Sequence, residues 1–174
     1  AIIIVHMLGM GGDIKRVVDL GKKLNLPIIE DNCEAIGAKF NDRYLGTIAD
    51  IGVMSFDHGK MIACGEGGMV LTNRKEYAEF VSQYSDHGHE NNPKLPRGKD
   101  RRIMPGFNYR LTEIQAAIGK VQLSKLEFML NENKKRYEIL RKSISNFSKV
   151  RSELPFHQGS YDTFILSIND KNLR

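Results

Sequence analysis

The chain has 174 residues, which is enough for one domain or for one domain and part of a second. Hydrophobic residues make up 41% of it and charged residues 27%, a composition that is ordinary for a soluble globular protein and excludes wholesale disorder. The net charge of +5 arises within residues 94–110, which contain six basic residues and one acidic residue. The rest of the chain is therefore neutral overall.

The sequence also bounds the cellular context. The apolar run at residues 1–5 is far too short to cross a membrane, and no signal-peptide pattern is present. Two cysteines, Cys33 and Cys64, cannot make a disulfide framework. We therefore expect a cytoplasmic protein with no membrane partner. Because the sequence lacks an initiator Met and opens inside an apolar run, we expect it to be a fragment of a longer chain.

The first thirty residues predict a strand, a helix and a second strand. Residues 1–5 are β-branched and apolar, as in a buried parallel strand. Asp13 can cap a helix that ends near Asn25, and Pro27 begins a second strand that runs into Asp31. This order implies parallel pairing with a right-handed crossover. Asp31 then lies at the carboxyl edge of the sheet, where ligands bind in open α/β folds.

The middle of the chain predicts further short elements. We expect a short helical piece around residues 34–39, a polar turn at residues 41–43 and a strand over residues 51–56. A glycine-rich turn at residues 65–68 precedes a strand over residues 69–72. Aromatic and aliphatic side chains at helical spacing then predict an amphipathic helix over residues 75–85.

Residues 86–107 carry three prolines and several glycines and are predicted to form a long loop, which in a compact domain is usually functional or disordered. The local basic excess lies in and directly after this loop. Its members are Lys94, Arg97, Lys99, Arg101, Arg102 and Arg110. An excess confined to one segment fits an anionic ligand better than a nucleic acid laid over a surface; the alternative is a solvated loop.

The last third of the chain is predicted to be helical and then extended. Thr112 and Gln115 form a plausible capping box, and the helical pattern continues to about Ser145 in one or two helices. After Pro155 a strand-like run over residues 163–168 begins a new unit. The predicted fold class is therefore α/β, with the start of a second, smaller domain at the end.

Residues 55–68 hold the densest chemical signal. Lys60 lies between a strand and glycine turns rather than on a charged helix face, and a partly buried lysine there can attack a carbonyl carbon to make a Schiff base. Ser55, at the end of the preceding strand, could donate its hydroxyl to a phosphate. An ordinary surface lysine and a turn-capping serine are the alternatives on spacing alone.

Asp31 is the second candidate. A carboxylate at the end of a buried strand needs a cationic or donor partner, because an unpaired buried charge is costly. A protonated pyridine nitrogen would be such a partner, and pyridoxal phosphate (PLP) chemistry depends on one. Asp31 could equally cap the short helix predicted after it, and spacing does not decide between the two.

Three motifs occur in an order and spacing that resemble a known family. They are residues 30–38 (Glu-Asp-Asn-Cys-Glu-Ala-Ile-Gly-Ala), the Ser55–Gly68 segment, and Gly106-Phe107-Asn108-Tyr109-Arg110-Leu111 with the following glutamines Gln115 and Gln122. Together they closely resemble the DegT/DnrJ/EryC1/StrS family of PLP-dependent sugar aminotransferases. The resemblance covers nearly the whole chain. It implies a fold-type-I aminotransferase, with residues 1–130 in the large PLP-binding domain and residues 131–174 as the connecting helix and the beginning of the small domain.

The resemblance also implies roles for individual residues. Lys60 matches the lysine that binds the cofactor covalently and moves the proton, Asp31 the carboxylate paired with the pyridinium nitrogen, and Ser55 the hydroxyl at the phosphate. Asn108 matches an asparagine that reaches the phosphate site of a neighbouring subunit, which implies a homodimer with a shared active site. Glu34 stands where many members have Gln or His near the cofactor ring, so it too is assigned to the cofactor site.

Substrate contacts are predicted from the histidines and the basic loop. His58 lies two residues before Lys60 and is a candidate for contact with the substrate, against a simple turn role. Arg97, Arg101 and Arg102 offer bidentate donors for a phosphate or carboxylate on a sugar. The run at residues 87–93 resembles the enzymes that make 8-amino-3,8-dideoxy-octulosonate. Its two histidines lack the spacing of a zinc motif, so no metal site is predicted.

The leading interpretation is transamination of a keto sugar, nucleotide-linked or carboxylated, in cell-surface or lipopolysaccharide sugar biosynthesis, with glutamate as the amino donor implied by the resemblance. One alternative is a PLP-dependent sugar dehydratase of the same family, in which His replaces the lysine at position 60. Another is a non-enzymatic module that binds anions or nucleic acid through the basic loop, although no helix-turn-helix pattern is recognisable.

Overall fold

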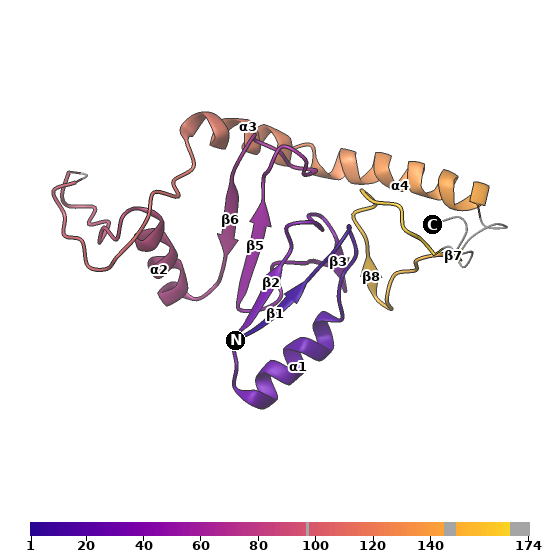
Figure 1. Ribbon diagram of the computed structural model, residues 1–174, viewed down its shortest axis with the longest axis horizontal. Coiled ribbons are helices and arrows are strands. Elements are labelled where there is room, and N and C mark those ends of the chain that lie inside the picture. Colours follow the sequence, from indigo (N-terminus) through magenta and orange to yellow (C-terminus); the bar gives the residue numbers. More distant parts are fainter. Residues whose placement is uncertain (97, 145–148, 168–174) are drawn as a thin grey trace.

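The computed structural model describes residues 1–96, 98–144 and 149–167. Its centre is a four-stranded sheet with strand order β1-β2-β5-β6. The strands are β1 (Ile2–Val5), β2 (Ile28–Asp31), β5 (Ile51–Ser55) and β6 (Gly68–Leu71). The first three are parallel, and β6 runs antiparallel to β5 (Figure 1). The parallel pairing predicted for the first two strands is confirmed, so their carboxyl ends share one edge.

The crossover helix α1 (Ile14–Leu24) packs against β1 and β2 as predicted. Asp13 caps it by accepting a hydrogen bond from the backbone N–H of Arg16 at 3.2 Å. Gly21 faces the sheet, where a Cβ atom would come within 2.4 Å of Ile28 Cδ1, so only glycine permits this close approach. The core beneath the helix consists of Ile4, Ile14, Ile28, Ala35, Ala38 and Leu45.

The short helix predicted around residues 34–39 is wrong. Turns occupy this segment and lead into β3 (Lys39–Phe40), which pairs with β4 (Arg43–Tyr44) through a turn at Asn41 and Asp42, as the polar-turn prediction required. Gly37 has a φ of +89°, which no helix contains, and Leu130 fills the place where its Cβ would be. Packing of the small residues into the core therefore overrides their helical propensity.

Strand β3 also pairs with β8 (His157–Gln158), so a segment near the end of the chain returns to the side of the sheet (Figure 1). A second small pair joins β7 (Lys149–Val150) to β9 (Leu166–Ser167). The strand predicted over residues 163–168 is thus reduced to β9 within the described residues, and Ile168 lies outside them. The return of β8 brings residues 157–162 to the same region of the molecule as the loop after β1.

The remaining helices agree closely with the sequence. Helix α2 spans Lys75–Ser85, as predicted. The capping box of Thr112 and Gln115 is present and begins α3 (Glu113–Leu123), and α4 (Leu126–Ile144) follows after a two-residue break. The two helices run one after the other along one side of the molecule (Figure 1). The boundary predicted between residues 130 and 131 falls inside α4, and the division into two domains stays a prediction.

Within the ranges that the structure describes, no helix combines the length and the apolar character that a membrane crossing requires.

Candidate active site

Asp31 and Ser55 lie at the carboxyl edge of the parallel sheet. Asp31 is the last residue of β2 and pairs in register with Val53 of β5, and Ser55 is the last residue of β5. The two strands are neighbours, so a carboxylate and a hydroxyl lie at the same edge of the sheet, where α/β folds bind ligands.

Asp31 does not cap a helix, because the structure has no helix at residues 33–39. One carboxylate oxygen, Oδ1, accepts a hydrogen bond from the backbone N–H of Cys33 at 3.1 Å. The Cys33 thiol also forms a hydrogen bond with this carboxylate. The helix-cap alternative from the sequence is therefore excluded, and a ligand-binding role for Asp31 stays a prediction.

Lys60 is held by Glu34. Its Nζ donates a hydrogen bond to Glu34 Oε1 at 3.1 Å, and the two side chains are 24% and 36% exposed. A backbone hydrogen bond from Lys60 N–H to the carbonyl of Asp57 fixes the turn that presents the lysine. The surface-lysine alternative does not fit this pairing, because most of the side chain is withdrawn from solvent and its amine is oriented by a carboxylate.

Ser55 and Cys33 complete the immediate surroundings. The Ser55 hydroxyl oxygen accepts a hydrogen bond from the backbone N–H of Asp57 at 3.3 Å, and no acceptor for its own O–H is found in the described part of the chain. Burial, together with a hydrogen bond to Asp31 and its negative charge, raises the pKa of Cys33 to about 11. Cys33 is therefore a neutral thiol near pH 7 and is not a nucleophile.

These side chains match the functional groups of PLP one by one. Asp31 offers a carboxylate to a pyridinium nitrogen, Ser55 offers a hydroxyl donor to a phosphate, and Lys60 offers a primary amine to an aldehyde. All three stand at the ends of two adjacent strands or in the turn that follows one of them. The donor set therefore fits this cofactor.

A buried, hydrogen-bonded pair of side chains, Glu30 and His6, lies next to this edge. Glu30 and His6 are fully buried, and their side chains lie 3.2 Å apart between Oε2 and Nε2. Burial alone would raise the pKa of Glu30, but hydrogen bonds from His6 and from the backbone N–H groups of Ala49, Gly46 and Ile48 outweigh it and lower the pKa. His6 is thus a packed structural histidine, and sequence reasoning missed the role of Glu30.

His58 and Asn108 are not drawn into this cluster. The imidazole of His58 is 83% exposed and lies 2.9 Å from the Asp57 carboxylate. Asn108 is exposed and pairs through its backbone with Asp86, and no contact between it and Lys60 occurs among the described residues. A role for Asn108 in a neighbouring subunit is consistent with this separation and stays a prediction, as does substrate contact by His58.

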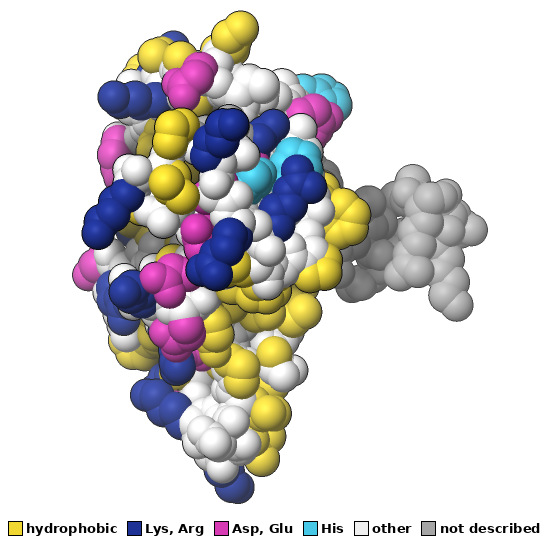
Figure 2. Space-filling model, turned by 90° about the vertical axis from the view of Figure 1, so that its left-hand side faces the viewer, with side chains coloured by type: hydrophobic (Ala, Val, Ile, Leu, Met, Phe, Trp, Pro, Cys, Tyr) yellow, Lys and Arg dark blue, Asp and Glu magenta, His cyan; other side chains and the backbone are white. Residues whose placement is uncertain are grey.

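Two basic side chains in and directly after the loop of residues 86–107 are paired with carboxylates. The Arg101 guanidinium lies 3.2 Å from the Glu90 carboxylate, and that of Arg110 lies 2.7 Å from Asp86. Arg102 is exposed, and Arg97 lies outside the described residues. Figure 2 shows the molecule from this side, and basic side chains are interspersed there with acidic ones instead of forming a continuous basic patch. A nucleic-acid surface is therefore poorly supported.

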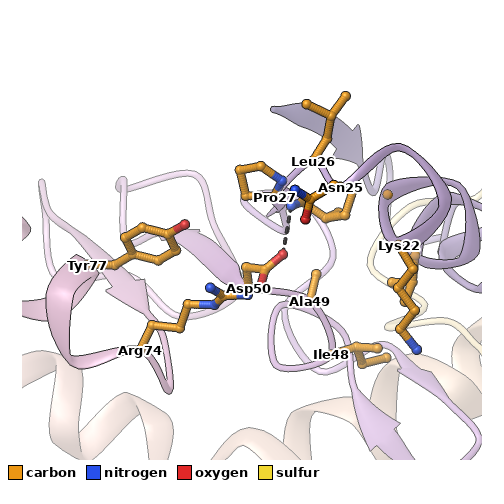
Figure 3. A pocket seen from close by; sticks show the side chains of 12 residues that line it. Lys22, Asn25, Leu26, Pro27, Ile48, Ala49, Asp50, Arg74 and Tyr77 are labelled. Carbon is orange, nitrogen blue, oxygen red and sulfur yellow. Dashed lines mark hydrogen bonds and ion pairs between the residues drawn. The ribbon is translucent and has the colours of Figure 1, made fainter.

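A cavity of about 610 Å³ lies at the opposite edge of the sheet, between the end of α1 and the start of α2. Asp50 and Arg74 form an ion pair on its wall at 2.6 Å, with Tyr77 beside Arg74 (Figure 3). Asp50 also accepts a hydrogen bond from the backbone N–H of Ile28. None of the predicted site residues lines this cavity.

Comparison with known proteins agrees with the geometry. A model of the DegT/DnrJ/EryC1/StrS aminotransferase family matches residues 1–172. The chain is 36% identical over 153 residues to GDP-perosamine synthase of Escherichia coli O157:H7, covering 88% of this chain and 41% of that protein.

Two solved structures share the fold. A DegT DnrJ EryC1 StrS aminotransferase from Brucella abortus superimposes with a TM-score of 0.87 at 27% identity, covering 99% of this chain and 45% of that one. The GDP-4-keto-6-deoxy-D-mannose-3-dehydratase of E. coli, solved with bound hydrated PLP, gives 0.85 at 25% identity over 97% of this chain and 47% of that one. The chain thus spans less than half the length of these relatives. Its α/β fold is that of the PLP-dependent aminotransferases, and the chain belongs to the DegT/DnrJ/EryC1/StrS aminotransferase family.

Proposed function

We propose that the whole protein carrying this chain is a PLP-dependent aminotransferase that transfers an amino group from glutamate to a keto sugar in the biosynthesis of cell-surface or lipopolysaccharide sugars. The observation that carries the proposal is the Lys60 amine, oriented by Glu34 in the turn after β5, which itself neighbours the strand that ends in Asp31. GDP-perosamine synthase, a relative at 36% identity, supports the sugar class.

Each residue has a defined task in this proposal. When bound, PLP supplies an electron sink for the carbon that loses its proton. Asp31 keeps the pyridine nitrogen protonated, and Ser55 donates a hydrogen bond to the phosphate. Lys60 binds the cofactor covalently and, once released, carries the proton at its Nζ atom. Glu34 holds that amine in place, so that less conformational entropy is lost when the amine reaches its reactive orientation.

The family also contains sugar dehydratases, such as the E. coli protein among the structural neighbours. The resemblance assigns those enzymes a histidine at the position of Lys60. A lysine can form the covalent bond that transamination needs and a histidine cannot, so position 60 favours the aminotransferase.

The substrate and the assembly are proposed at a finer level. We place a phosphate or carboxylate of the sugar at the basic loop of residues 94–110, with Arg97, Arg101 and Arg102 as donors. An 8-oxo-octulosonate is one such carboxylated sugar, and a nucleotide-linked sugar is the other class. We further propose a homodimer in which Asn108 completes the partner's phosphate site, and a large domain that ends near residue 130.

The test is spectroscopic and uses the whole protein purified with PLP. Glutamate alone should bleach the visible band of the bound cofactor and release 2-oxoglutarate in an amount equal to the sites. Adding a keto sugar should restore the band and yield an amino sugar. A sugar product that has lost a hydroxyl group and gained no amino group would indicate the dehydratase instead of the aminotransferase.

A further inference from the structure

A segment that follows α4 returns to the candidate active site. The backbone N–H of Ser160 donates to the carbonyl of Gly9 at 2.9 Å, and the N–H of Gly9 donates to the carbonyl of Glu34 at 2.7 Å. Gly9 lies in the loop after β1, and Glu34 in the loop after β2. Residues 160–162 are thereby fixed beside the residue that holds Lys60.

This segment carries a second carboxyl group. Ser160 is fully buried, and its hydroxyl donates to Asp162 Oδ1 at 3.0 Å. Gly9 has a φ of +76°, and a Cβ there would lie 2.2 Å from Asp162 Oδ1 and 2.7 Å from Ser160 Oγ. The loop after β1 therefore leaves room for this pair only because residue 9 is glycine, although about 150 residues separate the two segments.

Asp162 and Glu34 act on one another electrostatically. Desolvation of the Asp162 carboxyl raises its pKa, the Ser160 hydrogen bond opposes this, and the negative charge of Glu34 raises the pKa further. Glu34 connects the two groups, because its Oε1 lies 3.1 Å from Lys60 Nζ and its charge acts on Asp162. Carboxyl groups accept hydrogen bonds from hydroxyl groups and, when ionised, repel a phosphate or a carboxylate.

We propose that Asp162, oriented by Ser160, binds hydroxyl groups of the sugar and excludes anionic groups from this side of the site. The inference rests on the proposed aminotransferase function and deepens it by assigning one wall of the site to the polyol part of the substrate. The anionic part of the sugar and the carboxylates of glutamate then bind away from Asp162. Asp162 is thus a specificity-determining residue for the sugar and not for glutamate.

The experiment measures binding without turnover in the whole protein with PLP. Lys60→Ala removes the chemistry, and calorimetry then gives the affinities of glutamate, GDP-perosamine and 8-amino-3,8-dideoxy-octulosonate as probes. Asp162→Asn and Asp162→Ala are compared with Asp19→Asn, which removes one carboxylate on the exposed side of α1. At least one amino sugar should bind roughly tenfold more weakly in the Asp162 variants, while glutamate binds as tightly as before or more tightly. Asp19→Asn should change neither.

Steady-state kinetics of the active protein, which keeps Lys60, gives a second readout through the KM values of the two substrates. Asp162→Asn should raise the KM of the sugar and leave that of glutamate within twofold, and Ser160→Ala should shift both in the same direction but less. Should the Asp162 variants fail to fold, Ser160→Ala carries the test alone. Equal losses for both substrates, or none for either, would overturn the inference while the aminotransferase stands. A wild-type protein that binds neither glutamate nor an amino sugar would overturn the proposed function and the inference with it.

Discussion

The amine of Lys60 donates a hydrogen bond to Glu34 Oε1 at 3.1 Å, across 26 positions of sequence. The pairing joins the loop after β2 to the turn after β5, which are neighbouring strands. It gives Glu34 a concrete task, because the carboxylate orients the amine that the proposed chemistry requires.

Replacing Glu34 by Gln should weaken catalysis without abolishing it. Gln keeps an oxygen that can accept from Lys60 but loses the charge that strengthens the bond. The side chain is partly exposed, so solvent screens the loss, and we expect kcat to fall roughly three- to tenfold. Steady-state kinetics of the whole protein checks this, with Glu127→Gln as a charge-matched control on α4. A loss as complete as that of a Lys60 variant would mean that Glu34 itself transfers a proton.

Asp31→Asn should preserve the shape of the site and remove the charge that keeps the pyridine nitrogen protonated. The rate should therefore fall by orders of magnitude, while PLP still binds. Single-turnover absorbance with glutamate measures the rate, and equilibrium dialysis of PLP measures the binding. Near-normal turnover in this variant would show that Asp31 only stabilises the turn at Cys33.

Glu30 should make the fold sensitive to acid. Its pKa in the folded state lies below the ordinary value of 4.5, so its ionised form stabilises the fold above that value. This stabilisation is lost as the pH falls through the lower folded-state pKa. Denaturant unfolding between pH 7 and pH 3 should show the loss in the wild type.

The matching variant is Glu30→Gln, whose amide cannot accept from all four donors around it. It should lower the free energy of unfolding at pH 7 by about 1–3 kcal/mol and flatten the acid limb. Glu76→Gln, at an exposed carboxylate, should do neither. An acid limb unchanged in Glu30→Gln would assign the pH dependence to other carboxylates.

The basic loop should select the sugar rather than the amino donor. Single Arg97→Ala, Arg101→Ala and Arg102→Ala variants should raise the KM of the sugar far more than that of glutamate in at least one case. Arg101 is 83% exposed and already paired with Glu90, so its contribution should be smaller than the roughly 1.5–3 kcal/mol of a desolvated charge-assisted bond. If all three variants keep kcat/KM for the sugar within twofold at fixed ionic strength, the loop is a solvated face.

Local patterns in the sequence predicted most of the fold. The cap at Asp13, the helix over residues 75–85 and the capping box at Thr112 depend on neighbouring residues, and each is present. The helix predicted over residues 34–39 is absent because Gly37, with a φ of +89°, packs against the distant Leu130. Propensity cannot report such long-range packing.

Only part of the candidate site could likewise be predicted from the sequence. Asp31 and Ser55 could be placed at one edge because parallel strands align their carboxyl ends. The pairing of Lys60 with Glu34, the support by Glu30 and the approach of Asp162 all join residues more than 15 positions apart. No periodicity or motif spacing encodes these contacts, since they depend on how the loops fold over the sheet.

The central claim is that Lys60 carries the chemistry, and borohydride reduction of the PLP-loaded whole protein tests it most directly. The wild type should lose its visible band on reduction and carry the reduced cofactor on the peptide that contains Lys60, as identified by mass spectrometry. Lys60→Ala should bind PLP only noncovalently, carry no label after reduction and show no transamination. Label on another lysine, or normal transamination by Lys60→Ala, would contradict the account.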